Sequence, residues 1–311
     1  MSSVEPLPPL PNLIIAGAPK CGTTSLFDYL VQHPQVGGSS VKETCYFMDR
    51  GYPLFKAQSN YLDHGMEGYQ GYFAHLDPQR PKLICEATPD YLYQQSALEH
   101  IADLPGDVTI LFMLRHPADR AYSMFRFAQH NIGVIPKKFD FTDFLDDLDR
   151  HAESYAQRLI LRDLLRHGYY HTYLRNWKAR YGDRMQVYLF EEMAADPRGF
   201  MQRLAQRLDI DPDYYATAPL GVENSTVRVR FQPVHRLYRR LRRRDWLRAL
   251  PMAQSATRFY RRFNVEKSGR SSRSDRDQQR LTALSRCYQT EMTLIEQEFG
   301  LDLTAWRRRY G

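Results

Sequence analysis

The chain has 311 residues, of which 43% are hydrophobic and 25% charged, as in an ordinary soluble globular protein. No apolar run approaches the roughly 18 residues that a membrane-spanning helix needs, and the four cysteines (Cys21, Cys45, Cys85 and Cys287) lack the spacing of a zinc site or a disulfide framework. These features exclude a cysteine-rich scaffold and an evident membrane span, and they predict a reduced, cytoplasmic protein.

The positive charge is concentrated in one stretch. The chain carries a formal net charge of +7, yet residues 228–262 alone hold twelve arginines and one acid, so the remainder is net negative. Apolar residues recur there at helical spacing, which predicts a basic helical segment packed by one face. The alternative is a lid that attracts an anionic acceptor or contacts a membrane surface peripherally. Nucleic acid is not expected, because the aromatic residues do not repeat as a stacking platform.

Residues 1–11 contain four prolines and no basic residue ahead of an apolar core, so they predict a disordered leader rather than a secretory signal. We expect residues 12–311 to form a single domain, because no internal repeat or linker interrupts them. An apolar run over 13–17 leads through small residues to helical spacing from Thr23. This order predicts a strand, a phosphate-binding loop and a helix.

The loop resembles a nucleotide P-loop in its glycines but not in its lysine. Gly17 and Gly22 are five residues apart, yet Lys20 precedes the second glycine and Thr23 stands where a kinase or NTPase carries lysine. Backbone N–H groups of such a loop, and the helix N-terminus behind it, still favour an anion. The sequence therefore predicts a phosphate site that is not necessarily an ATPase site.

Later segments alternate between strand and helix patterns. Strands are predicted over 82–89, 108–114 and 186–190, and helices over 141–148, 159–165, 169–180, 197–208 and, closing the chain, 278–299. The apolar run over 108–114 indicates a strand buried on both faces of a parallel sheet. The predicted fold class is α/β, a P-loop-like doubly wound parallel sheet flanked by helices, with ligands at the carboxyl ends of the strands.

A second anion site is predicted where the strand over 108–114 ends. Arg115 follows this strand directly, Pro117 suits the first turn of a helix, and Ser123 lies two turns further along. An arginine fork and a hydroxyl can hold one anion. A magnesium-dependent NTPase would carry an aspartate at this strand end, so we expect an anion site without a metal.

These residues resemble those of sulfotransferases that use 3′-phosphoadenosine-5′-phosphosulfate (PAPS) and release adenosine 3′,5′-bisphosphate (PAP). The segment 19–26 is similar to their 5′-phosphosulfate loop, and 114–123 to their 3′-phosphate motif, especially that of the heparan sulfate branch. Further matches are 42–47, 86–91 and 168–170 leading to Trp177. The resemblance covers residues 13–270.

The resemblance implies a set of residues for each end of the donor. The 5′-phosphosulfate would be held by Lys20, Cys21, Gly22, Thr23, Thr24 and Ser25. The 3′-phosphate would be held by Arg115 and Ser123. A late loop of the family closes over the nucleotide, and its counterparts here are Lys267, Gly269 and Arg270, without the proline that usually follows. A flexible Ser/Arg-rich linker is the alternative for that loop.

Glu43 stands where the family places its catalytic base. An acceptor hydroxyl or amine must lose a proton as it attacks sulfur, and a carboxylate within hydrogen-bond reach can take it. Lys20 would offset charge on the bridging oxygen of the leaving phosphate. Heparan-type relatives carry histidine where this chain has Cys45, which leaves the acceptor environment open. The alternatives are a surface pair of Glu43 with Lys42, or a base among His33, His116 and His130.

The expected function is transfer of a sulfuryl group from PAPS to a hydroxyl or amine of a carbohydrate or small-molecule acceptor, with no metal. Two alternatives stay open. A P-loop kinase or NTPase would turn over ATP with magnesium. A non-catalytic anion- or membrane-binding protein would use the basic segment 228–262, and Glu43 would be dispensable.

Overall fold

The computed structural model describes residues 9–77, 81–155, 159–221, 227–229, 265–267 and 273–310. At its centre lies a five-stranded sheet in the order β2-β3-β1-β4-β5, with all neighbours parallel. The strands are β1 (Leu13–Gly17), β2 (Val36–Gly38), β3 (Leu83–Ala87), β4 (Thr109–Leu114) and β5 (Met185–Leu189). The carboxyl ends of β1 and β4 are therefore neighbours at one edge of the sheet, where such folds bind ligands.

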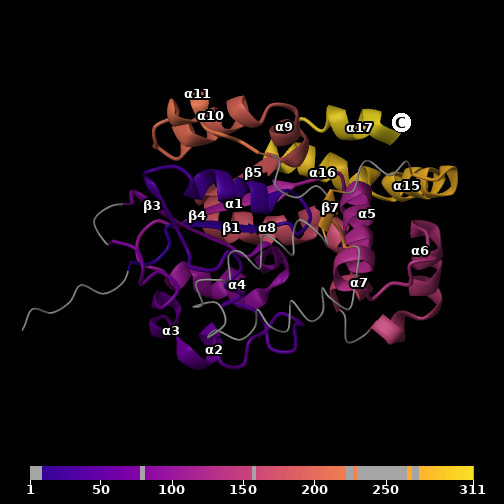
Figure 1. The fold of residues 1–311 in the computed structure, drawn as a ribbon, viewed down its shortest axis with the longest axis horizontal. Helices are drawn as coiled ribbons and strands as arrows, with labels where there is room; N and C mark the ends of the chain where they lie inside the picture. Colours follow the sequence, from indigo (N-terminus) through magenta and orange to yellow (C-terminus); the bar gives the residue numbers. More distant parts are fainter. Residues whose placement is uncertain are drawn as a thin grey trace, which may run out of the picture.

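Helices cover both faces of this sheet, as the predicted doubly wound fold requires. In Figure 1, α1 (Thr23–Val31), α10 (Pro197–Arg207) and α11 (Tyr214–Thr217) lie on one side of the strands, and α4 (Gln95–His100) lies on the other. The other α-helices before the basic segment are α2 (Tyr61–His64), α3 (Glu67–Gln70), α5 (Pro117–Phe127), α6 (Phe141–Arg150), α7 (Leu159–Arg162), α8 (Tyr170–Tyr181) and α9 (Phe190–Ala195). The α/β fold class is confirmed.

The core forms around β1 and β4, which are apolar along their whole length. All five residues of β1 are buried, as are the last five of β4, because helices pack on both sheet faces. From α8, Trp177 meets the Phe112 ring of β4 at 5.2 Å between centroids, and its Nε1–H donates to Leu92 O at 3.2 Å. The two central strands thus form a rigid base for the loops that follow them.

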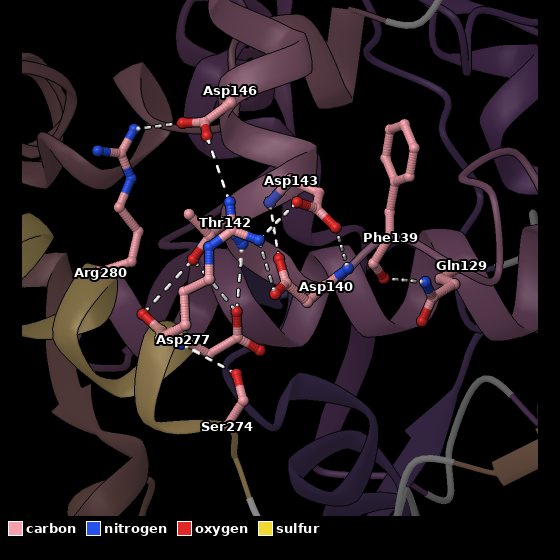
Figure 2. Close-up of polar contacts among 10 residues, drawn as sticks. Gln129, Phe139, Asp140, Thr142, Asp143, Asp146, Ser274, Asp277 and Arg280 are labelled. Atoms are coloured by element: carbon pink, nitrogen blue, oxygen red, sulfur yellow. Dashed lines mark hydrogen bonds and ion pairs between the residues drawn. The ribbon is translucent and has the colours of Figure 1, made fainter.

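A second packing unit joins α5, α6 and α15 (Asp275–Cys287). Asp140 caps α6 by accepting a hydrogen bond from Asp143 N–H at 2.7 Å, and Asp143 returns the contact in a capping box. Figure 2 shows Asp277 of α15 near Thr142, and Thr142 N–H donates to Asp277 Oδ1 at 3.2 Å. These polar contacts hold α15 against α6.

The prediction of one closing helix over 278–299 is wrong in its bounds. The segment forms α15 and α16 (Gln289–Phe299), and a further helix, α17 (Thr304–Tyr310), follows. The break falls at Tyr288, which is 1% exposed and donates its hydroxyl to Leu165 O at 2.6 Å. Gly300, with φ 65°, ends α16. The apolar spacing continues through the break, so the sequence pattern does not reveal it.

Several predictions concern stretches outside the described residues. Of the leader, only residues 9–11 are described. Of the basic segment, only Arg228 and Val229 are described, and they lie in β6 (Val227–Val229), which pairs antiparallel with β7 (Val265–Lys267). The expected helix is therefore wrong for these two residues, whose backbone pairs in a ladder instead. The single-domain assignment stays a prediction.

None of the described helices is both long and apolar enough to cross a membrane.

Candidate active site

The loop after β1 turns at two residues with left-handed backbone, Lys20 (φ 71°) and Gly22 (φ 83°). Ala18 N–H donates to Met113 O at 2.8 Å, which ties the loop to β4. A Cβ at Gly22 would lie 2.6 Å from Phe190 Cδ2, so this turn requires glycine. α1 begins directly after it, and the N–H groups of a first helical turn lack helical acceptors. The loop therefore has the backbone form of an anion site.

The small residues of the loop differ in exposure. Thr23 and Ser25 are 4% and 7% exposed, and Cys21 is fully buried, whereas Thr24 is partly exposed. Cys21 Sγ lies 3.8 Å from Tyr170 Oη, and burial raises the pKa of its thiol to about 11. The Cys21 thiol is therefore neutral and packs against Tyr170, and its expected place in the donor loop stays a prediction.

The Lys20 side chain is a cation in a poorly solvated position. Its Nζ lies 4.0 Å from the centroid of the Phe127 ring. Burial, followed by the positive charge of Arg115, lowers the pKa of Lys20 to about 8, while Glu43 acts in the opposite direction. An anion bound beside the ammonium would offset this desolvation.

Arg115 lies next to the loop, at the carboxyl end of β4. Its Nη1–H donates to Lys20 O at 3.5 Å, and its guanidinium carbon lies 4.8 Å from the centroid of the Phe190 ring. Tyr170 Oη donates to Arg115 O at 2.9 Å. The two cationic positions predicted from separate motifs are thus neighbours. Ser123, partly exposed, lies on α5.

The start of α5 is fixed by His116, which is fully buried. Its Nδ1 accepts from Ala118 N–H at 3.2 Å, so Nε2 carries the proton and donates to Ser285 Oγ at 3.0 Å. Burial lowers the pKa of His116 to about 4, which keeps the ring neutral. Glu191 accepts from His116 N–H at 3.1 Å and from Trp306 Nε1–H at 2.8 Å. His116 therefore caps a helix, and this role disfavours it as a base.

Glu43 lies in the segment after β2. Its side chain is 48% exposed and pairs at 2.8 Å with Lys42 Nζ, whose side chain is 18% exposed. The predicted alternative pair of Glu43 with Lys42 is therefore present, although only Glu43 is exposed. The pair does not remove Glu43 from the loop, because its charge acts on Lys20. Glu43 therefore remains an accessible carboxylate near the Lys20 ammonium.

A buried acid supports the turn that carries Glu43. Glu86, at 0% exposure, accepts at Oε1 from Thr44 Oγ1 at 3.1 Å and from Thr44 N–H at 3.4 Å, and from Thr88 Oγ1. Burial raises the pKa of Glu86 to about 7, against the effect of these hydrogen bonds. Cys45, 5% exposed, donates its N–H to Thr88 Oγ1 at 3.2 Å. Cys45 is thus a buried residue that helps to hold the turn in place.

His33 is engaged in the protein as well. It is 2% exposed, its Nδ1 accepts from Gln35 N–H at 3.1 Å, and its Nε2 lies 2.9 Å from Asp211 O. A general base needs a free lone pair directed at the acceptor, so these contacts disfavour His33.

The late loop lies almost wholly outside the described residues. Gly269 and Arg270 are not described, and Lys267 is described only as the last residue of β7. Its register partner is Val227. The role of this loop in closing over a nucleotide stays a prediction.

Two aromatic rings that contact the cations were not predicted from the sequence: Phe127 beside Lys20 and Phe190 beside Arg115. A usable signal exists for both. Phe190 follows β5 directly, at the same sheet edge as the loop, and Phe127 lies four residues after Ser123 on α5. Residues at strand ends and on the ligand face of a helix are candidates in such a fold. The supporting roles of Glu86, which lies in the matched segment 86–91, and of Glu191 were not predicted either.

Comparison with known proteins identifies the family. Residues 10–229 match the sulfotransferase domain model. Membrane-associated sulfotransferase kil1 of Dictyostelium discoideum is 32% identical over 120 residues, which are 38% of this chain and 23% of that protein. Bifunctional heparan sulfate N-deacetylase/N-sulfotransferase 3 of Homo sapiens is 25% identical over 211 residues, which are 66% of this chain and 23% of that protein. The chain spans about a quarter of the length of each of these relatives.

A solved structure has the same fold. The crystal structure of a sulfotransferase from Alicyclobacillus acidocaldarius matches with a TM-score of 0.64 and 22% identity, over 96% of this chain and 100% of that one. The family model spans the loop after β1, Glu43, Arg115 and Ser123. These matches agree with the motifs read from the sequence: the chain belongs to the sulfotransferase family.

Proposed function

We propose that this protein transfers a sulfuryl group from PAPS to a hydroxyl or amine. The observation that carries the proposal is the juxtaposition of Lys20 and Arg115 at the carboxyl ends of two neighbouring strands. Lys20 is desolvated and lies near a second cation, so its charge is offset best by a bound anion. PAPS carries a phosphosulfate at one end and a phosphate at the other, which matches two adjacent cationic positions.

The residues around the loop support this donor. The backbone turn at Gly22 has no room for a side chain and leads into a helix N-terminus, which suits the 5′-phosphosulfate. We assign Lys20, Thr23, Thr24 and Ser25 to that end, with Cys21 contributing packing. Arg115 and Ser123 are assigned to the 3′-phosphate. Arg115 can supply a charge-assisted fork.

In the proposed step, the acceptor oxygen or nitrogen attacks sulfur in line with the bridging phosphate oxygen. The bond from acceptor to sulfur forms as the bond from sulfur to the bridging oxygen breaks, and PAP leaves with that electron pair. The acceptor proton passes to the Glu43 carboxylate. Lys20 offsets the charge that builds on the bridging oxygen. No metal is required, because the two cations supply the positive charge.

The acceptor is proposed as a carbohydrate or a small molecule. Among the relatives, the human protein named above carries heparan sulfate in its name, and carbohydrate sulfotransferase 15 of Rattus norvegicus is 24% identical over 248 residues. Both names point to sugar acceptors for those proteins. Contact of the basic segment with a membrane surface or an anionic acceptor, and a cytoplasmic location, stay predictions.

Nucleotide-dependent thermal stabilisation tests the donor. PAP should raise the melting temperature in the presence of a chelator, because binding to the folded state stabilises it by mass action. ATP with magnesium should give a smaller rise. The opposite ranking would favour a kinase or NTPase and overturn the proposal.

Transfer itself is tested with labelled sulfate. PAPS carrying the label is incubated with pools of sugars, amines and phenols, and label in the acceptor is separated from label in the donor. Glu43→Gln, which keeps the side-chain size, is the matched control. Nucleotide binding without transfer to any pool would instead support the non-catalytic alternative.

A further inference from the structure

Three arginines gather around one buried carboxylate on α5. Asp119 is 2% exposed. Its Oδ1 accepts from Arg273 Nη2–H and from Tyr310 Oη at 2.7 Å, and its Oδ2 pairs with Arg309. The third arginine is Arg115, which lies four residues before Asp119, between β4 and α5. Burial favours a raised pKa for Asp119, but Arg115, the Tyr310 hydrogen bond, Arg273 and Arg309 together hold it below its usual value.

The charges in this cluster do not balance. Asp119 contributes one negative charge, and Arg309, directly paired with it, neutralises that charge. Among these four described side chains, Arg115 and Arg273 then leave a surplus of two positive charges, because both remain protonated at neutral pH. A phosphate monoester near pH 7 carries a charge of about −1.5 to −2. The surplus is therefore the size that one terminal phosphate would offset.

Arg273 is held in place against α5. Its Nη1–H donates to Tyr310 Oη at 2.8 Å, and its guanidinium carbon lies 4.9 Å from the centroid of the Tyr122 ring. Asp119, Tyr122 and Ser123 are three and four residues apart on α5, so they share one helix face. Arg273 contacts the first two of these residues, on the helix face that also carries the third. Its two hydrogen bonds use two of five guanidinium N–H groups.

We propose that Arg273, oriented by Asp119 and Tyr310, is a further ligand of the donor's 3′-phosphate, beside Arg115 and Ser123. This inference rests on the proposed function. In this arrangement α17 contributes to nucleotide binding without touching the nucleotide, because Tyr310 and Arg309 set the position of Asp119. Asp119 and Tyr310 are thus positioning residues.

A ligand pair that differs only in the 3′-phosphate isolates the effect. PAP and adenosine 5′-phosphate are titrated by calorimetry into the full chain and into Arg273→Gln. The affinity for PAP should fall about 10- to 100-fold, as for loss of a charged hydrogen bond, while the affinity for adenosine 5′-phosphate should change less than about twofold. Arg273→Lys, which keeps the charge but loses the fork, should lie between the two.

Arg276, in the first turn of α15, provides a matched control three residues after Arg273. It pairs with Asp140 at 3.1 Å and Asp143 at 2.6 Å, on the acidic face of α6 that Figure 2 shows with Asp146 and Arg280. Arg276→Gln removes the same charge three residues away and should leave both affinities unchanged. Melting temperatures of all variants are measured first, and Arg273→Lys replaces Arg273→Gln if the latter fails to fold.

The outcomes separate the two proposals. Equal losses for both ligands would make Arg273 a structural residue only and overturn the inference, and so would an unchanged PAP affinity. Either result leaves the proposed function intact if the unmodified chain binds PAP. If the unmodified chain binds neither ligand, the proposed function and this inference both fall.

Discussion

The loop that carries Lys20 and the turn that carries Glu43 follow two strands of the same sheet but differ in solvation. Lys20 is desolvated, lies over an aromatic ring and has an arginine for a neighbour. Glu43 is half exposed, and its partner Lys42 has a side chain that is 18% exposed. The Lys20 loop is short of negative charge before any ligand binds. The Glu43 turn already has its charge neutralised by a partner that water can replace.

This difference in solvation suits two separate tasks, binding of the donor and removal of a proton from the acceptor. A donor of high negative charge needs cations that are fixed and poorly hydrated, since interactions between charges strengthen away from water. A general base must exchange protons with an acceptor and then with solvent, so it must stay accessible. The turn that carries Glu43 is held in place by buried Glu86, which accepts a hydrogen bond from Thr44. Substitutions at Glu43 should therefore change the rate of transfer, and substitutions at Lys20 or Arg115 should change the affinity for the donor nucleotide.

The largest expected effect is on the Glu43 side. Glu43→Gln should lower the turnover number for sulfate transfer by about 10²- to 10⁴-fold, because the acceptor proton loses its base. PAP affinity should stay within about twofold, since the donor cations are untouched. Initial rates at saturating PAPS, with PAP binding by calorimetry, check both parts. A variant that retained the parental rate would show that the base lies elsewhere.

On the donor side, Arg115→Ala should act on binding. PAP affinity should fall by about 1.5–3 kcal/mol, the range for a hydrogen bond to a charged group, which is about 10- to 150-fold. Affinity for adenosine 5′-phosphate should fall much less. Titration calorimetry with both ligands measures this, and Arg276→Ala, whose guanidinium pairs with Asp140 and Asp143, serves as the control for loss of charge. An unchanged PAP affinity would contradict the assignment of Arg115 to phosphate.

The pKa of Lys20 predicts a pH dependence for the same binding step. With a pKa of about 8 in the free protein, Lys20 is charged at pH 7.5 and mostly neutral at pH 9. A bound anion favours the ammonium and raises its pKa, so binding takes up a proton and PAP affinity falls as pH rises past 8. From pH 7.5 to 9 the loss should be about tenfold.

Buffers of different ionisation enthalpy, used in calorimetry at pH 8.5, report the proton uptake. Lys20→Arg, which stays charged over this range, should show no uptake and a flatter profile. Proton release on binding, or an identical profile for the variant, would show that Lys20 does not titrate at the donor site.

The smallest expected effect is at the Lys42–Glu43 pair. Lys42→Met should change the free energy of unfolding by less than about 1 kcal/mol, because the Glu43 carboxylate is half exposed and water can replace its contact with Lys42. PAP affinity should also stay close to the parental value. Urea denaturation monitored by circular dichroism measures the stability. A loss of several kcal/mol would mean that the Glu43 turn is held from its surface and not from Glu86.

Much of the site can be predicted from sequence because its motifs are local. The strand, loop and helix around Lys20 lie within 19 residues, and Arg115 and Ser123 within nine, so patterns of apolar spacing, glycine and proline identify them. Together with the resemblance, they indicated the fold class and the family correctly. The apolar pattern also gave the later helices, with errors at their ends and at the Tyr288 break.

Local pattern could not decide contacts between distant parts of the chain. Lys20 and Arg115 are 95 positions apart, and Asp119 and Tyr310 are 191 positions apart, so only the packed sheet and the final helix bring them together. Burial was decided there too: the lowered pKa of Lys20, the neutral His116 cap and the buried Glu86 all depend on which neighbours exclude water. The sequence by itself determined which chemical groups are available, and the tertiary structure decided their distances and solvation.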